Sequence, residues 1–222
     1  SPGDRPVSGP LSQAQRALID HHDYFAAMTS GSRAERAFHP RRVALLQRCV
    51  DCSGMRVLDL GSSSGPLSVP LLEAGIDVVS VDLSEELLER LRGYAVERGV
   101  SATTVLADGA ELPFEDSSFD VVFVASVVHL VPDPGPLLRE AERVCKPDGR
   151  IVVAGPWSKH PKSNVLIKTI LRGGKPPDGR QYPFDLPRLR RWLSRSTLVD
   201  KRMDWLFGYF ATAWVPDRKP LP

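Results

Sequence analysis

Cysteine and long apolar runs are both scarce in this chain of 222 residues. Three cysteines in a chain of this length argue against the disulfide framework of small secreted domains. No apolar run approaches the roughly 18 residues that a membrane-spanning helix requires. The first residues also lack the basic and then apolar pattern of a signal peptide. We therefore expect a cytoplasmic protein, and because the chain begins at Ser1 we expect its natural start to be trimmed or replaced.

Two of the three cysteines, Cys49 and Cys52, have the spacing C-x-x-C. That spacing is found in redox-active pairs and in half of a zinc site. A structural zinc ion needs four ligands, and the sequence has no second C-x-x-C and no H-x-x-x-H to complete them. We expect two unrelated thiols near the end of a helix, and no metal.

Charge is nearly balanced over the whole chain but unevenly distributed along it. Residues 1–158 carry 15 Lys and Arg against 22 Asp and Glu, whereas residues 159–222 carry 14 against 5. The basic C-terminal part is consistent with an anionic partner and equally with a solvated basic surface. The length and the apolar content suit one globular domain with a full α/β core.

The N-terminal part of the chain is expected to form a tail and two helices. Residues 1–11 are predicted to be disordered, because the first ten include three prolines and two glycines and have no apolar periodicity. A helix is predicted over residues 12–28, with Ser12 as its N-cap. A second is predicted over residues 40–50, where Val43, Leu46 and Val50 share one face. We expect residues 12–50 to cap the core.

From residue 55 onward, short apolar strands alternate with helical segments. Strands are predicted at residues 55–60, 77–81, 102–107, 120–125 and 150–154. Helices are predicted at 66–74, from Ser84 through 93 or beyond, and at 136–144, where the sequence Lys-Pro-Asp-Gly then supplies a break. A last helix at 186–193 precedes two apolar stretches, 197–203 and 209–214, that can add a hairpin to the sheet edge. This alternation predicts an α/β fold with a doubly wound, mostly parallel sheet and an antiparallel edge hairpin.

The first strand runs into a loop of small residues, Asp59 to Gly65. In a doubly wound sheet, ligands bind at the carboxyl ends of the strands, near the point where the strand order reverses. Small residues allow a sharp turn and a close approach to a ligand, and the next helix offers free N–H groups. A purely structural turn explains the loop equally well.

Two further aspartates follow the next strands. Asp82 ends the second strand, 23 residues after Asp59, where a carboxylate can accept the hydroxyls of a ribose. Asp108 ends the third strand, where its oxygens can accept from an adenine amino group. Three strand ends with matched chemistry, in sequence order, favour an adenosine-bearing cofactor.

These residues belong to a series of motifs that resembles the class I S-adenosylmethionine (SAM)-dependent methyltransferases, in particular the small-molecule branch called methyltransferase type 11. The resemblance extends from about Met55 to Ala154. The motifs, in order, are Val57–Gly65, Val81–Ser84, Ala107–Phe114, Ser118–Val122, Val128–Asp133 and Lys146–Gly149. The resemblance implies a Rossmann-like fold, with a cofactor-binding core at 55–154, a substrate lid at 155–184 and a last helix and edge strands at 185–216.

The resemblance also implies a role for individual residues. Asp59 would anchor the ammonium group of SAM, directly or through water, and the amino-acid end would lie on Gly61, Ser62, Ser63 and Gly65. Asp82 would bind the ribose hydroxyls, and the adenine would contact Leu83, Asp108, Gly109 and Ala110. The methionine chain and sulfonium would lie near Ala125 and Ser126, with Tyr24 of the first helix covering the cofactor.

Two positions depart from the family pattern. Ser63 replaces the usual middle glycine of the loop, which reduces backbone freedom and adds a hydroxyl. The usual Gly-Gly after Lys-Pro is Asp148-Gly149, a plausible turn.

Two absent motifs separate this reading from its rivals. NAD-binding folds carry G-x-G-x-x-G, whereas this loop has glycines at 61 and 65 and an acid, Asp59, that suits an ammonium group better than a pyrophosphate. No [DNS]-P-P-[YFW] run follows the fourth strand, where adenine N-methylases usually carry one, and no RNA-binding module is visible.

The catalytic base and the acceptor are less well defined by the sequence. Methyl transfer depends largely on holding the nucleophile in line with the methyl group, and a general base is needed only for some acceptors. His129, after the fourth strand, and His160, after the fifth, are candidate bases, although a packing role or surface exposure explains each. Trp157, His160 and Tyr182 are candidate substrate contacts.

We therefore predict a SAM-dependent methyltransferase that acts on a small organic acceptor, for which an anionic group is one option. The alternatives are an RNA methyltransferase and a SAM-binding protein without catalytic activity. A small-molecule substrate is the expected partner, with neither nucleic acid nor membrane, and the oligomeric state is left open.

Overall fold

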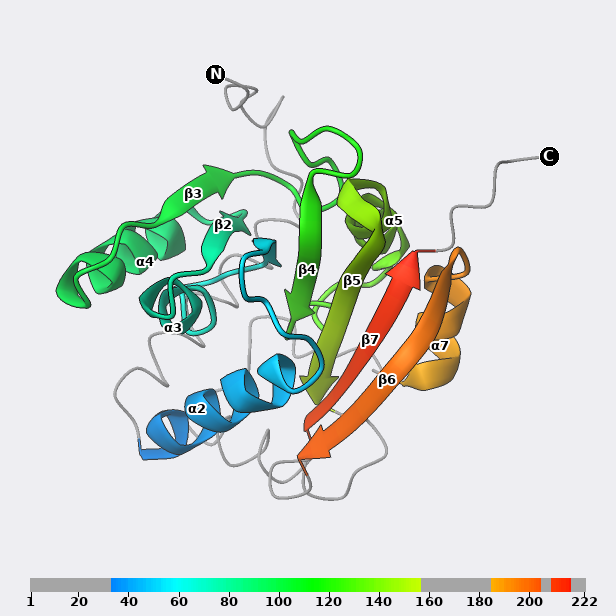
Figure 1. Ribbon diagram of the computed structural model, residues 1–222, viewed down its shortest axis with the longest axis horizontal. Coiled ribbons are helices and arrows are strands. Elements are labelled where there is room, and N and C mark those ends of the chain that lie inside the picture. Colours follow the sequence, from blue (N-terminus) through cyan, green and yellow to red (C-terminus); the bar gives the residue numbers. More distant parts are fainter. Residues whose placement is uncertain (1–32, 157–184, 205–208, 217–222) are drawn as a thin grey trace.

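The structure is a computed structural model that describes residues 33–156, 185–204 and 209–216. A seven-stranded sheet forms the middle of three layers, with helices on both of its faces (Figure 1). The predicted α/β class, with a mostly parallel sheet and an antiparallel edge, is confirmed. Among the described residues, no helix combines the length and apolarity that crossing a membrane would require.

Five parallel strands make up most of the sheet. They are β1 (Arg56–Leu60), β2 (Asp77–Asp82), β3 (Thr103–Leu106), β4 (Phe119–Ala125) and β5 (Cys145–Pro156). Their spatial order is β3-β2-β1-β4-β5, so the chain reverses its direction of growth between β1 and β4. Both of these strands are buried on both faces, which explains their nearly continuous apolar sequences. The carboxyl ends of β1 and β4 thus lie at the topological switch point.

The C-terminal hairpin completes the sheet. Strand β6 (Ser196–Asp204) lies at the edge, and β7 (Tyr209–Pro216) is inserted between β5 and β6, antiparallel to both. The predicted hairpin is therefore confirmed, and the structure adds the order of its strands. This order agrees with the burial of the two strands. The inner strand β7 is almost entirely buried, whereas Val199 of the edge strand β6 is half exposed.

Three helices pack on one face of the sheet. Helix α2 (Arg33–Gln47) buries Val43, Leu45 and Leu46 against alternate residues of β1, β4 and β5. Helix α3 (Ser68–Glu73) packs on β2 and on helix α4 (Glu85–Glu97). Ser84 is the N-cap of α4, as predicted, because its hydroxyl accepts from the N–H of Leu87 at 3.3 Å.

Two helices cover the other face. Helix α5 (Gly135–Val144) and helix α7 (Leu186–Trp192) contact each other and bury Leu138, Ala141 and Leu189 in the larger apolar cluster. Residues Leu58, Leu60, Val122 and Val124 face this cluster, whereas Val57, Val121 and Phe123 face the other one. The alternation of strand side chains thus supplies both cores from the same strands.

Two predicted boundaries are wrong. Helix α2 begins at Arg33 rather than at residue 40, with Pro40 inside it, and ends at Gln47, so Val50 lies beyond the helix and packs against the core from a loop. Strand β5 begins at Cys145 rather than at Arg150, because residues 146–149 form an irregularity within the strand. Phe119 pairs with Cys145, and Val121 pairs with Arg150. The Lys-Pro-Asp-Gly sequence therefore interrupts the pairing without ending the strand.

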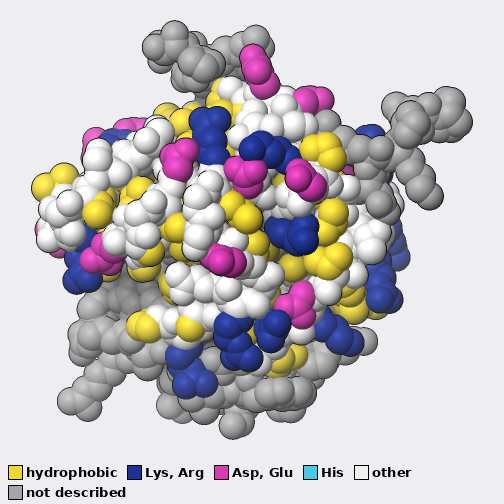
Figure 2. Space-filling model, in the orientation of Figure 1, with side chains coloured by type: hydrophobic (Ala, Val, Ile, Leu, Met, Phe, Trp, Pro, Cys, Tyr) yellow, Lys and Arg dark blue, Asp and Glu magenta, His cyan; other side chains and the backbone are white. Residues whose placement is uncertain are grey.

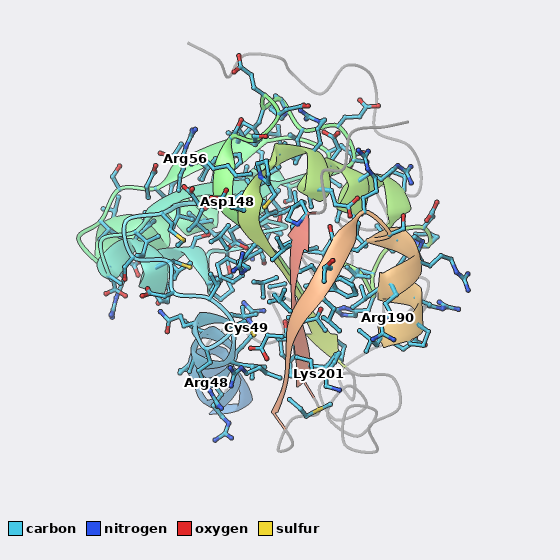
Figure 3. All side chains as sticks on the ribbon, turned by 45° about the vertical axis from the view of Figure 1, so that its right-hand side comes forward. Arg48, Cys49, Arg56, Asp148, Arg190 and Lys201 are labelled. Atoms are coloured by element: carbon cyan, nitrogen blue, oxygen red, sulfur yellow. The ribbon has the colours of Figure 1, made fainter. Side chains whose placement is uncertain are left out.

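The three cysteines lie partly or fully buried. All three are free thiols, and burial raises the pKa of Cys49 and of Cys52 to about 11. Cys49 lies at the end of α2, next to Arg48 (Figure 3). Within the described part of the chain, no group of His, Cys, Asp and Glu side chains is arranged to hold a metal ion.

Candidate cofactor site

A pocket that is partly open to solvent lies at the carboxyl ends of β1, β2 and β3. Its walls are mostly apolar, and two carboxylates, Asp82 and Asp108, line it. The other lining residues come from three strand ends, the loop after β4 and helix α5: Leu60, Gly61, Val81, Leu83, Ala107, Gly109, Val127, Val131 and Leu137. An apolar slot with a few fixed polar groups is the usual form of a small-ligand site.

The loop after β1 is held close to β2. The N–H groups of Gly61 and Ser62 both donate to the carbonyl of Val81, at 2.8 and 3.0 Å. Gly61 has a φ of 76°, and a Cβ at this position would lie 2.3 Å from Cγ2 of Val127. Only glycine fits here, for reasons of both conformation and space. The loop therefore brings its bare backbone to the wall of the pocket.

Asp82 connects two backbone segments of this wall. Its carboxylate accepts from the N–H of Ser63 at 2.8 Å and from the N–H of Ser84 at 3.0 Å, one bond to each oxygen. Each carboxylate oxygen can accept two hydrogen bonds, so Asp82 retains acceptor capacity on the side that faces the pocket. Two backbone donors also fix the orientation of its side chain.

The loop after β3 forms the opposite wall. Oδ1 of Asp108 accepts from the N–H of Ala110 at 2.9 Å, which holds the turn that follows the strand. Gly109 lies between Leu60 and Leu137, where a Cβ would come within 3.1 Å of both side chains. Leu83 and Leu137 line the same pocket as the two aspartates. A planar apolar ring with polar edges would fit this space.

Asp59 lies beneath the loop rather than on the wall of this pocket. It is 2% exposed, and its Oδ2 accepts from the Ser68 hydroxyl at 2.6 Å, which in turn accepts from Ser80 at 2.8 Å. Burial raises the pKa of Asp59 to about 6, while the Ser68 hydrogen bond and the positive charge of Arg42 act in the opposite direction.

A second polar cluster lies at the end of β4. Ser126 follows the strand with a left-handed φ of 68°, and its hydroxyl is 2.7 Å from the hydroxyl of Tyr209. Nη1 of Arg42, from helix α2, donates to the same Ser126 oxygen at 3.4 Å. Arg42 is nine-tenths buried, and among the described residues its Nε and the buried hydroxyl of Ser62 have no hydrogen-bond partner. Two buried polar atoms without partners indicate a polar ligand nearby.

Arg42 and Tyr209 are residues that the sequence reasoning did not single out. For Arg42 a signal was available, because it lies one helical turn before Leu46 and next to Val43, on the apolar side of the helix. A cation on an apolar face is rare unless it has a partner. For Tyr209 no local signal separates it from the other aromatic residues of the hairpin.

The remaining predicted residues lie in different places. Gly65 packs against Leu91, and a Cβ there would lie 2.7 Å from that side chain. Ala125 is the buried last residue of β4. His129 is 8% exposed in the turn after β4 and does not line the pocket described above. Four predicted residues lie outside the described part of the chain: Tyr24, Trp157, His160 and Tyr182.

Several basic residues of the described C-terminal part lie on the surface. Arg190, Arg191, Arg195 and Lys201 are exposed on and around α7 and β6, with Arg190 and Lys201 labelled in Figure 3. On the face seen in Figure 2, acidic and basic side chains are intermixed. For these described residues, a solvated basic surface accounts for the positive charge.

Comparison with known proteins identifies the domain that contains the pocket. Residues 58–153 match the family model described as a methyltransferase domain, which is the segment that contains every strand end of the pocket. The chain therefore carries a methyltransferase domain, and the relatives and solved structures to which it is similar include SAM-dependent methyltransferases. An uncharacterized protein of Mycobacterium tuberculosis is 33% identical over 186 residues, which are 84% of this chain and 66% of that relative. The chain thus spans just under two thirds of the length of this relative.

Two further similarities concern named methyltransferases. The demethylmenaquinone methyltransferase of Clavibacter sepedonicus is 40% identical over 114 residues, which are 50% of this chain and 45% of that protein. The magnesium protoporphyrin IX methyltransferase of Synechocystis PCC 6803, solved with bound S-adenosylhomocysteine (SAH), has the same fold. Its TM-score is 0.70 at 20% identity, covering 92% of this chain and all of that one.

SAM is the cofactor of this methyltransferase family, and the residues present fit it. Its adenosine half needs acceptors for ribose hydroxyls and for an amino group, and Asp82 and Asp108 line the mostly apolar pocket from two strand ends. Its amino-acid end carries one positive and one negative group. The buried Asp59 and the buried Arg42 lie close enough for their charges to interact. A negative charge and a positive charge are therefore both present near the same strand ends.

Proposed function

We propose that this methyltransferase binds SAM at the ends of β1, β2, β3 and β4 and transfers its methyl group to a small organic acceptor. The observation that carries the proposal is the pair Asp82 and Asp108, which line one pocket from two strand ends and are each held by backbone N–H donors. A single aspartate would be unremarkable, but two fixed carboxylates flanking an apolar slot match the polar edges of adenosine.

In this proposal the adenosine half lies in the slot. Asp82 accepts the ribose hydroxyls, while two backbone N–H groups hold its carboxylate in place. Asp108 accepts from the adenine amino group, with the backbone of Gly109 and Ala110 beside it. The side chains of Leu83 and Leu137 cover the ring faces, which excludes water from the slot.

The amino-acid end lies over the loop after β1. Asp59 provides the negative charge for the ammonium group, and Gly61, Ser62, Ser63 and Gly65 allow the backbone to approach. Arg42 provides the positive charge for the carboxylate, with Ser126 beside it. The methyl group then lies beyond the end of β4, near Ala125 and Ser126.

The bound cofactor supplies a methyl group on a sulfonium, which is already activated toward nucleophiles. The contribution of the protein is therefore mainly to orient the acceptor in line with it and to exclude water. His129, in the turn after β4, is the candidate base in the described part of the chain. Beyond that part, His160 is a candidate base, and Trp157, His160 and Tyr182 are candidate substrate contacts. A small acceptor is supported by the relatives named above, whose names refer to demethylmenaquinone and magnesium protoporphyrin IX.

The test is calorimetric titration of the chain with SAM, SAH and NAD. We expect SAM and SAH to bind and NAD not to bind; binding of NAD alone contradicts the proposal. In the variant Asp82→Asn, we expect SAH affinity to fall by roughly tenfold or more, since one hydrogen bond to a charged group contributes about 1.5–3 kcal/mol. A methylation screen over small molecules and RNA then identifies the acceptor class, and tight SAH binding without any methylation would favour a non-catalytic role.

A further inference from the structure

Tyr209 is the first residue of β7, far from the cofactor-binding core in sequence. It is 3% exposed, and its hydroxyl contacts the hydroxyl of Ser126 at 2.7 Å and hydrogen-bonds with the side chain of Arg42. These three residues come from α2, from the end of β4 and from the C-terminal hairpin. The chain separations are 84 residues between Arg42 and Ser126 and 83 between Ser126 and Tyr209.

The donors and acceptors in this cluster limit the directions of hydrogen bonding. A guanidinium has donors only, so the oxygens of Tyr209 and of Ser126 both accept from Arg42. Between Tyr209 and Ser126 either hydroxyl can be the donor. Where Tyr209 donates, the oxygen of Ser126 accepts from two donors, and its own proton is available to a ligand.

The backbone of Tyr209 is fixed within the sheet, whereas Arg42 enters the cluster through a long side chain. Tyr209 pairs with Pro156 of β5 on one side and with Asp204 of β6 on the other, so its backbone is held from both sides. Arg42 reaches the cluster on a long side chain with many rotatable bonds, and its hydrogen bond to Ser126, at 3.4 Å, is long. A fixed hydroxyl beside it restricts the positions that the guanidinium can adopt.

The other buried polar groups of β7 behave differently. The hydroxyl of Thr212 donates to the carbonyl of Val153, and the indole N–H of Trp214 donates to Thr212. Both bonds stay within the β5–β7 pairing, so they stabilise the sheet. The hydroxyl of Tyr209 instead contacts groups at the cofactor end.

We propose that Tyr209 is a positioning residue for cofactor binding, which orients Arg42 and Ser126 so that both donate to the carboxylate of SAM. This inference rests on the proposed function. Burial raises the pKa of the Tyr209 hydroxyl, so it remains protonated at neutral pH and can donate to Ser126. The groups that act on it are the cation of Arg42, the carboxyl of Asp59 and the hydroxyl of Ser126.

The test uses a ligand pair that differs in one group, SAM and decarboxylated SAM, titrated into wild type and Tyr209→Phe. Phenylalanine keeps the ring and removes the hydroxyl. We expect the Kd of SAM to rise by about tenfold, as for loss of a hydrogen-bond network to a charged group, and the Kd of decarboxylated SAM to change by less than about twofold. The matched control is Thr212→Val, which removes a buried hydroxyl from the same strand and should leave the ratio of the two Kd values unchanged.

A second variant tests the coupling. Ser126→Ala should weaken the binding of SAM but not that of decarboxylated SAM. Tyr209→Phe should raise the Kd of SAM by a smaller factor in the Ser126→Ala background than in wild type, because Tyr209 acts partly through the Ser126 hydroxyl. Equal losses for both ligands in Tyr209→Phe, no loss for either, or full additivity with Ser126→Ala would overturn the inference. If wild type binds neither ligand, the proposed function itself fails, which is a separate result.

Discussion

At position 63 the chain carries a serine where the backbone adopts a left-handed conformation, with φ of 52°. This conformation costs a residue other than glycine roughly 1 kcal/mol. The N–H of Ser63 donates to Asp82 at 2.8 Å, a charge-assisted bond that offsets this cost. The family's usual glycine is therefore replaceable at 63, whereas position 61 has no space for a side chain.

Gly61→Ala separates steric exclusion from backbone strain. The new Cβ would lie 2.3 Å from Val127 at a φ of 76°, so we expect SAH affinity to fall by roughly tenfold or more as the loop shifts. Gly99→Ala is the matched control, because Gly99 has a φ of 73° and open space around its Cβ position. It should lower the melting temperature through strain alone and leave SAH affinity unchanged. Equal affinities of the two variants for SAH would contradict the prediction.

Asp59 should make stability depend on pH. Burial raises its pKa from 3.8 to about 6, so the unfolded chain releases this proton first as the pH rises. The contribution of Asp59 to the free energy of unfolding therefore falls as the pH rises from about 4 to about 6. The total decrease is up to about 3 kcal/mol, and the contribution stays constant above this range. Asp59→Asn removes the titration. We expect the unfolding free energy of the variant, relative to wild type, to increase from pH 4.5 to pH 7.5 in urea titrations; a constant difference would refute this.

At the scale of elements, the loop between β3 and β4 is held by a side chain of α5. Arg143 donates to the carbonyls of Leu112 and Phe114, at 3.0 and 2.7 Å, and pairs with Glu140 and Asp116. The loop begins at Asp108, one of the two carboxylates of the pocket. The position of Asp108 thus depends on a helix that follows it by about thirty residues.

Arg143→Met should test this attachment. It leaves two loop carbonyls without this donor, so we expect the unfolding free energy to fall by about 2 kcal/mol and SAH binding to weaken. Arg92→Met is the control, since Arg92 binds Glu85 and Thr104 at the surface of α4, where such pairs contribute at most about 1 kcal/mol. Denaturant unfolding of the two variants distinguishes them, and similar losses would count against a specific role for Arg143.

Elements were predictable where a local pattern defines them. The strands β1, β2 and β4 are nearly continuous apolar runs, and Ser84 starts α4 with a capping side chain. The errors lie where long-range contacts override the local signal. Pro40 indicates a helix start by itself, yet α2 extends upstream of it. Likewise Lys146–Gly149 looks like a break, but pairing with β4 on both sides includes it in β5.

At the scale of the whole molecule, the sheet order determines which distant segments meet at the site. The parallel strands place Asp82 and Asp108 at one edge, as their positions at strand ends predict. The insertion of β7 beside β5 places Tyr209 next to Ser126, and the packing of α2 on the same side of the sheet brings Arg42 to both. The site therefore combines a core of about one hundred residues with contributions from both flanking segments.

The sequence by itself determined the alternation of strands and helices, the α/β class and the acidic strand ends that line the pocket. These follow from local periodicity and from residue types at strand ends, which do not depend on distant contacts. The tertiary structure alone decided that Asp59 is buried with a raised pKa, that Arg42 lies inside, and that Tyr209 contacts Ser126. Burial and contacts across more than eighty residues arise only when the sheet assembles, so no local pattern contains them.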